Sequence, residues 1–120
     1  MSLYGTSKAV LVVEDEGLVR DVIAEALRVV GWRVFEVNTA ERAIALIPEP
    51  RIDLVFTDIQ LAGVLCGWDV AEQFRAVRAN LPIIYTSGNS PDRSRRVAGS
   101  LFFDKPYQPD DVVEACRRLC

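Results

Sequence analysis

The sequence contains no histidine among its 120 residues. The chain therefore lacks imidazole as a general base, as a metal ligand and as a site of self-phosphorylation. Cysteine is scarce, and Cys66, Cys116 and Cys120 form an odd set without a CxxC motif. We expect reduced thiols and a cytoplasmic location rather than a disulfide framework.

Long hydrophobic runs and an excess of positive charge are also absent. No apolar run approaches the roughly 18 to 20 residues needed to span a bilayer, and the run at residues 9–13 is too short for a signal peptide. The net charge of -3 does not favour a nucleic-acid or membrane surface. We interpret residues 1–8 as a lead-in, in which Met1-Ser2-Leu3 is compatible with an expression scar, and residues 9–120 as one domain.

Apolar runs of strand length alternate with segments of helical spacing along this domain. We expect strands at residues 9–13, 32–37, 54–57, 82–86 and 100–104. We expect helices at residues 17–30, 40–47, 68–79 and 110–120. Residues 90–99 are polar and have room for at most about two helical turns, so the helix there is expected to be short or irregular. The alternation predicts an α/β fold, a flavodoxin-like, doubly wound, five-stranded parallel sheet of order 2-1-3-4-5 with flanking helices.

Reactive side chains follow the expected strands at the points where the strands end. In chain order they are Glu14, Asp15, Asp58, Thr86, Ser87 and Lys105. Because the first and third strands are neighbours in this sheet order, we expect the three carboxylates to lie within a few ångströms of one another. Each residue also has an ordinary explanation: Asp58 and Ser87 as caps, the acidic pair as a helix start and Lys105 as a solvated turn residue.

Carboxylates that lie so close together repel, unless a divalent cation sits between them. Ligands that are all oxygen select a hard cation such as Mg²⁺. Lys105 adds a positive charge and Ser87 a hydroxyl at the same edge, so that cation, ammonium and hydroxyl could each contact one equatorial oxygen of a transferred phosphoryl group. Asp58, already ionised at neutral pH, would be the nucleophile that forms an aspartyl phosphate.

The sequences around these residues resemble those of one known family. The motifs are Val12-Val13-Glu14-Asp15, Phe56-Thr57-Asp58-Ile59, Tyr85-Thr86-Ser87-Gly88 and Phe103-Asp104-Lys105-Pro106. In this order and spacing they are similar to those of the receiver domain of bacterial two-component response regulators, over residues 9–119.

The resemblance implies a role for each site residue. Asp58 corresponds to the phosphoacceptor, Asp15 to the direct Mg²⁺ ligand and Glu14 to an acidic partner acting through water. The backbone carbonyl of Gln60 corresponds to the third protein ligand of the metal, and Lys105 pairs with Asp58. Ser87 corresponds to the switch hydroxyl, with Thr86 as the alternative, and Phe102 to the aromatic side chain that follows the switch. The Lys105–Pro106 bond is expected to be cis.

The resemblance further implies a signalling switch whose only chemistry is autocatalytic phosphoryl acceptance and self-dephosphorylation. The phosphoryl donor would be a sensor histidine kinase or a histidine phosphotransfer protein, and the output a downstream effector protein or a fused domain. Two alternatives remain: a phosphorylation-independent adaptor, and a Mg²⁺-dependent phosphatase of the haloacid dehalogenase type. The phosphatase needs a second Asp two residues after the nucleophile, where this chain has Gln60.

The chain also departs from the family in two spacings. Asp58 to Gly67 is longer than usual, which predicts a bulge near residues 64–66, and Ser87 to Lys105 is shorter. The short spacing leaves the dimer surface that many receivers build from the fourth helix, fifth strand and fifth helix in doubt.

Overall fold

The computed structural model describes residues 8–89 and 92–120, and its centre is one parallel sheet. The strands are β1 (Ala9–Val13), β2 (Arg33–Val37), β3 (Ile52–Asp58), β4 (Ile83–Ser87) and β5 (Leu101–Asp104). Their order across the sheet is β2-β1-β3-β4-β5, so the predicted topology is confirmed. β1 is buried along its whole length, as its unbroken run of apolar residues predicts.

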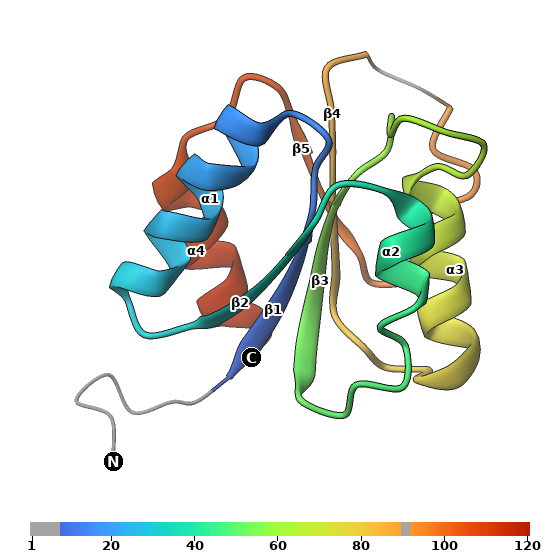
Figure 1. The fold of residues 1–120 in the computed structure, drawn as a ribbon, viewed down its shortest axis with the longest axis horizontal. Coiled ribbons are helices and arrows are strands. Elements are labelled where there is room, and N and C mark those ends of the chain that lie inside the picture. Colours follow the sequence, from blue (N-terminus) through green and yellow to red (C-terminus); the bar gives the residue numbers. More distant parts are fainter. Residues whose placement is uncertain (1–7, 90–91) are drawn as a thin grey trace.

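Helices cover both faces of this sheet (Figure 1). They are α1 (Gly17–Val29), α2 (Ala40–Ile44), α3 (Gly67–Val77) and α4 (Pro109–Leu119). α1 and α4 lie together on one face, and α2 and α3 lie on the other. Two hydrophobic clusters fill the two interfaces, with Leu11 and Val13 of β1 on one face and Val10 and Val12 on the other. This alternation is what a central strand buried on both sides requires.

Most expected boundaries differ from the observed ones by one or two residues, and α2 differs more. Thr39, one residue before α2, caps it by accepting a hydrogen bond from the backbone N–H of Arg42. α2 ends at Ile44 instead of 47, and residues 45–48 form turns before Pro50. β3 begins two residues earlier than expected, because Ile52 pairs with Ala9.

The first turns of α1 do not bury the apolar residues that the helical spacing places on one face. Ile23, Ala24 and Leu27 are buried, whereas Leu18 is 84% exposed and Val22 is 53% exposed. The helix predicted from this spacing is present, but its apolar residues do not all pack against the sheet. Leu18 and Val22 instead border a surface groove with Pro106, Tyr107 and Pro109.

The segment between β4 and β5 contains no helix in residues 88–89 and 92–100, the part that the structure describes. The predicted short or irregular element extends over Ser90, which lies outside the described residues together with Pro91. Arginines hold the segment in place: Arg95 forms ion pairs with Asp69 and Glu72 of α3. Arg75 of α3 donates to the carbonyl of Ala98 at 2.9 Å. These contacts tether residues 92–100, which we call the tethered loop, to α3.

In the described part of the chain, no helix has the length and the apolar character that crossing a membrane requires.

Candidate functional site

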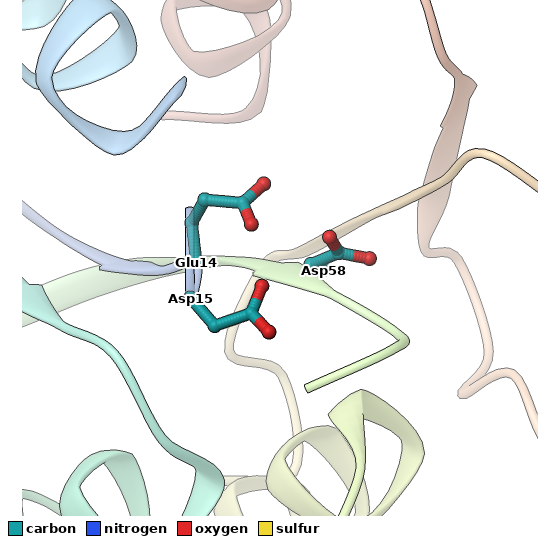
Figure 2. Close-up of side chains that lie close together, drawn as sticks. All are labelled: Glu14, Asp15 and Asp58. Atoms are coloured by element: carbon teal, nitrogen blue, oxygen red, sulfur yellow. The ribbon is translucent and has the colours of Figure 1, made fainter. Parts of the chain in front are cut away.

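The carboxyl ends of β1 and β3 bring three acidic side chains together. The two strands keep one register from the pair Val10–Leu54 to the pair Val13–Thr57, so the residues that follow them lie side by side. One carboxylate oxygen from each of Glu14, Asp15 and Asp58 lies within 4.8 Å of the others. Figure 2 shows the three carboxylates directed into the same space. The expected cluster therefore exists.

The three acids differ in burial and in their contacts. Glu14 is 1% exposed and Asp58 4%, whereas Asp15 is exposed. The backbone N–H of Glu14 donates to the carbonyl of Val37 at 3.1 Å, which ties the acidic turn to β2. Asp58 Oδ1 accepts a hydrogen bond from the backbone N–H of Gln60 at 3.1 Å. Two carboxylates are therefore held inside the protein and one faces solvent.

Lys105 connects the fifth strand to this cluster. Its Nζ lies 2.7 Å from Asp58 Oδ2 and 3.0 Å from Glu14 Oε1. Its backbone N–H donates to the carbonyl of Ser87 at 2.8 Å, and the peptide bond to Pro106 is cis, as expected. The lysine side chain thus bridges the ends of β1 and β3 from the end of β5.

This geometry shifts the proton affinity of two groups. Burial raises the pKa of Glu14 to about 7, and the negative charge of Asp58 raises it further. The hydrogen bonds from Glu16 and Lys105 lower this pKa but do not offset the burial. Burial alone would lower the pKa of Lys105, but the hydrogen bonds to Asp58 and Glu14 outweigh it and raise the pKa well above its usual value. The ammonium of Lys105 therefore stays charged at neutral pH, while the protonated form of Glu14 persists to a higher pH than is usual for a carboxylic acid.

The charge of the cluster suits a divalent cation. Three carboxylates and one ammonium, fully ionised, leave two negative charges uncompensated. The available donors are carboxylate oxygens, which favour a hard ion such as Mg²⁺ over a soft transition metal. The residues present therefore fit the metal that the sequence predicted.

The two candidate hydroxyls have different surroundings. Ser87 pairs with Asp104 in the sheet and is buried; its Oγ donates to the carbonyl of Asn89 at 2.5 Å. The Thr86 hydroxyl is buried and has no hydrogen-bond partner among the residues that the structure describes. Ser87 is thus the hydroxyl at the sheet edge that also carries Lys105, and its hydrogen bond to the loop would have to break for it to turn toward Asp58.

Gln60 lies at the mouth of the cluster. Its side-chain oxygen accepts a hydrogen bond from Asn89 Nδ2 at 3.3 Å, which joins the loops after β3 and β4. The part assigned to its backbone carbonyl stays a prediction.

Phe102 belongs to an aromatic cluster beside the site. Its ring centroid is 6.3 Å from that of Trp68 and 6.2 Å from that of Tyr85. The guanidinium of Arg93 lies 3.7 Å from the centre of the Phe102 ring and forms an ion pair with Asp104. Phe103 packs in the cluster on the opposite face of the sheet. The switching role of Phe102 remains a prediction.

Gly67 is a site residue that the sequence analysis did not identify. A Cβ at this position would overlap the carbonyl oxygen of Asp58 and lie 2.8 Å from Cα of Ile59. The backbone N–H of Gly67 donates to the carbonyl of Ile59 at 2.8 Å. The first turn of α3 therefore approaches the backbone of Asp58 so closely that only glycine fits. A glycine at a helix start is the signal in the sequence, but its contact with Asp58 depends on the tertiary fold.

Comparison with known proteins gives a consistent result. The sequence model of the response regulator receiver domain matches residues 10–117. The chain is 29% identical over 119 residues to the probable transcriptional regulatory protein TcrX of Mycobacterium tuberculosis, covering 96% of this chain and 50% of TcrX. The chain spans about half the length of the first curated relatives that it matches.

Solved structures show the same similarity. A response regulator receiver protein from Sinorhizobium medicae has a TM-score of 0.89 and 28% identity, with 94% of each chain covered. The response regulator TrrA from Thermotoga maritima, determined in complex with Mg²⁺-BeF, has a TM-score of 0.83 and 28% identity, covering 94% of this chain and 99% of that one.

Proposed function

Since the chain belongs to the response regulator receiver domain family, we propose that it is a signalling switch in which Asp58 accepts a phosphoryl group in the presence of Mg²⁺. The observation that carries the proposal is the contact of Lys105 Nζ with Asp58 Oδ2 at 2.7 Å, inside a cluster that also contains Glu14 and Asp15. A carboxylate nucleophile, a lysine ammonium and two further acidic side chains then occupy one sheet edge, as phosphoryl transfer to a carboxylate requires.

In this mechanism the residues of the chain divide the work. An oxygen of Asp58 attacks phosphorus, the bond from phosphorus to the imidazole nitrogen of the donor breaks, and the imidazole leaves as the neutral ring after taking up a proton. Lys105 then moves its hydrogen bond from Asp58 to an oxygen of the phosphoryl group, and Ser87 donates to a second one. Asp15, Asp58 and the carbonyl of Gln60 would hold the metal directly, and Glu14 would act through water. Bound Mg²⁺ supplies positive charge that offsets the developing charge on the phosphoryl oxygens.

The donor would be a phosphohistidine on a partner protein, and the groove beside the site offers a place for it. The groove has a volume of about 550 Å³. It is lined by Leu18, Val19, Val22 and Ile23 of α1 together with Lys105, Pro106, Tyr107 and Pro109. Because Lys105 belongs to both groove and site, a helix docked there would bring its phosphohistidine to Asp58. We therefore assign this groove, which we call the α1 groove, to the phosphohistidine-bearing helix of a kinase or phosphotransfer protein.

We further propose that residues 9–120 form the receiver domain after a lead-in at 1–8. The signal would pass through the surface around β4 and β5, where Ser87, Phe102 and the tethered loop lie, to an effector protein or a fused output domain.

The proposal is tested by incubating the protein with Mg²⁺ and acetyl phosphate and measuring its intact mass. We expect a gain of one phosphoryl group and no sustained release of phosphate from a model phosphate ester. Sustained release of phosphate from the ester would support a phosphatase. If the protein gains no phosphoryl group from acetyl phosphate and none from a phosphohistidine donor, the result would support the phosphorylation-independent adaptor.

A further inference from the structure

The turn between β1 and α1, residues 14–16, carries two of the three acidic side chains and is held by an arginine that has no role in the mechanism above. We propose that Arg20 is a positioning residue that fixes the Glu14 carbonyl and thereby the direction in which Asp15 presents its carboxylate to the divalent cation. The inference rests on the proposed function, because it concerns the metal site used there.

Arg20 joins the turn to the neighbouring strand. Its Nη1 donates to the carbonyl oxygen of Glu14 at 2.8 Å, and its Nε lies 3.5 Å from Glu36 Oε1 on β2. The other oxygen of Glu36 lies 2.9 Å from Arg28 Nη1. The side chains of Arg20 and Glu36 are 22% and 26% exposed, so both are partly sheltered from solvent. The guanidinium thus links a fixed point on the sheet to the peptide group that precedes Asp15.

Asp15 depends on this link more than its neighbours do. Glu14 and Asp58 are each held by Lys105, and Glu14 Oε2 also accepts from the backbone N–H of Glu16 at 3.2 Å. Within the described ranges, the exposed Asp15 carboxylate forms no hydrogen bond or ion pair of its own. Its direction therefore follows from the orientation of the Glu14–Asp15 peptide, whose carbonyl Arg20 holds.

If Arg20 positions the acidic turn, its removal should change Mg²⁺ affinity in the direction opposite to the one that its charge alone would predict. Arg20 is a cation near a cation site, so on charge alone its removal would strengthen Mg²⁺ binding. If Arg20 positions the acidic turn, its removal weakens Mg²⁺ binding, because residues that orient a metal ligand typically contribute about 10- to 100-fold to affinity. The sign of the change separates the two explanations.

The test measures Mg²⁺ affinity by isothermal titration calorimetry at pH 7.5 with the folded protein, checked by circular dichroism. We expect Arg20→Gln to bind Mg²⁺ about tenfold more weakly than the wild type. The matched control is Arg28→Gln. It also removes one positive charge from α1 and one ion pair to Glu36, but it leaves the contact with the Glu14 carbonyl in place. Its Mg²⁺ affinity should stay within about twofold of the wild type. Arg20→Lys, which keeps the charge but not the two-pronged contact, should fall between the wild type and Arg20→Gln.

Unchanged or tighter Mg²⁺ binding in Arg20→Gln would overturn the inference. If that variant does not fold, wild-type affinity in Arg20→Lys would do so. Asp15→Asn identifies a different failure: if it and the wild type both show no Mg²⁺ binding, the metal site of the proposed function is refuted instead.

Discussion

Two close approaches shape the site at the scale of single residues. Lys105 bridges Glu14 and Asp58, and Gly67 brings α3 against the backbone of Asp58. The first approach sets the charge around Asp58, and the second sets the position of the strand end from which Asp58 projects. Lys105 could be predicted from the sequence because parallel strands deliver their end residues to one edge. Gly67 could not be predicted, because no local sequence pattern indicates which glycine lies against the backbone of another segment.

Because Gly67 lies against the backbone of Asp58, adding one methyl group at this position should reduce both stability and the rate of phosphoryl acceptance. Gly67→Ala places a carbon where the Asp58 carbonyl stands, so α3 or the end of β3 has to shift. We expect a loss of about 1–3 kcal/mol in the free energy of unfolding and slower phosphoryl acceptance. Urea denaturation and the rate of mass gain with acetyl phosphate measure the two effects.

Gly17→Ala is the matched control for this substitution. Its Cβ would meet only Arg20 Nη2, at 3.8 Å, at the first position of α1. We expect wild-type stability or a small gain. Equal stabilities of Gly67→Ala and the wild type would show that the close approach is not a constraint.

At the scale of elements, the sequence predicted strands and order well and predicted the packed faces less well. Buried parallel strands are short, continuous apolar runs, so their positions can be recognised from the sequence. In α1 the apolar spacing continued through Leu18 and Val22, yet both are exposed beside the α1 groove. Hydrophobic periodicity predicts that a helix has an apolar face, but it does not predict which part of that face is covered by other elements. The loop 92–100 is held by Arg95 through partners more than 20 residues away, which a local pattern cannot indicate.

The α1 groove makes a prediction about the donor. Leu18→Glu should slow phosphoryl transfer from a phosphohistidine-bearing protein at least about tenfold, because a charge enters the apolar contact. Transfer from acetyl phosphate should be unaffected, since a small donor does not need the groove.

Val29→Glu is the control for Leu18→Glu. It introduces the same charge at a 62% exposed position of α1 that is not part of the groove lining. Radiolabel transfer from a purified phosphotransfer protein gives both rates. Equal rates for the two variants would place the donor elsewhere.

The tethered loop 92–100 makes a second prediction at this scale. Arg95→Ala removes its ion pairs to Asp69 and Glu72, so amide hydrogen exchange in peptides covering residues 92–100 should accelerate. Global stability should fall by less than about 1 kcal/mol, because these pairs are exposed. Arg117→Ala removes an ion pair that lies within α4 and serves as the control. Unchanged exchange in Arg95→Ala would show that the other contacts suffice to hold the loop.

At the scale of the whole molecule, the burial of Glu14 connects the site to stability. With its pKa raised to about 7 from the usual value of 4.5, Glu14 in the folded protein is mostly protonated at about pH 5 and loses its proton as the pH passes about 7, while in the unfolded chain it is mostly ionised over this range. The folded state then binds more protons, so the contribution of Glu14 to the free energy of unfolding decreases as the pH rises through this window, by up to about 3 kcal/mol.

Urea denaturation in metal-free buffer at pH 5 and pH 7.5 measures this contribution. The wild type should lose more stability than Glu14→Gln between the two pH values, because glutamine does not titrate. Glu16→Gln, an exposed substitution in the same turn, should follow the wild type. Parallel pH profiles of Glu14→Gln and the wild type would contradict the raised pKa.

The account as a whole depends on Asp58 as the phosphoacceptor, and one measurement tests this most directly. The wild type, Asp58→Asn and Asp53→Asn are incubated with Mg²⁺ and acetyl phosphate, and their intact masses are compared with and without a chelator. Asp53 lies on the same strand but accepts a hydrogen bond from Ala9 at 2.9 Å, at the end of β3 remote from the site. We predict one added phosphoryl group in the wild type and in Asp53→Asn, and none in Asp58→Asn or under chelation. A gain of the same mass in Asp58→Asn would contradict the central claim.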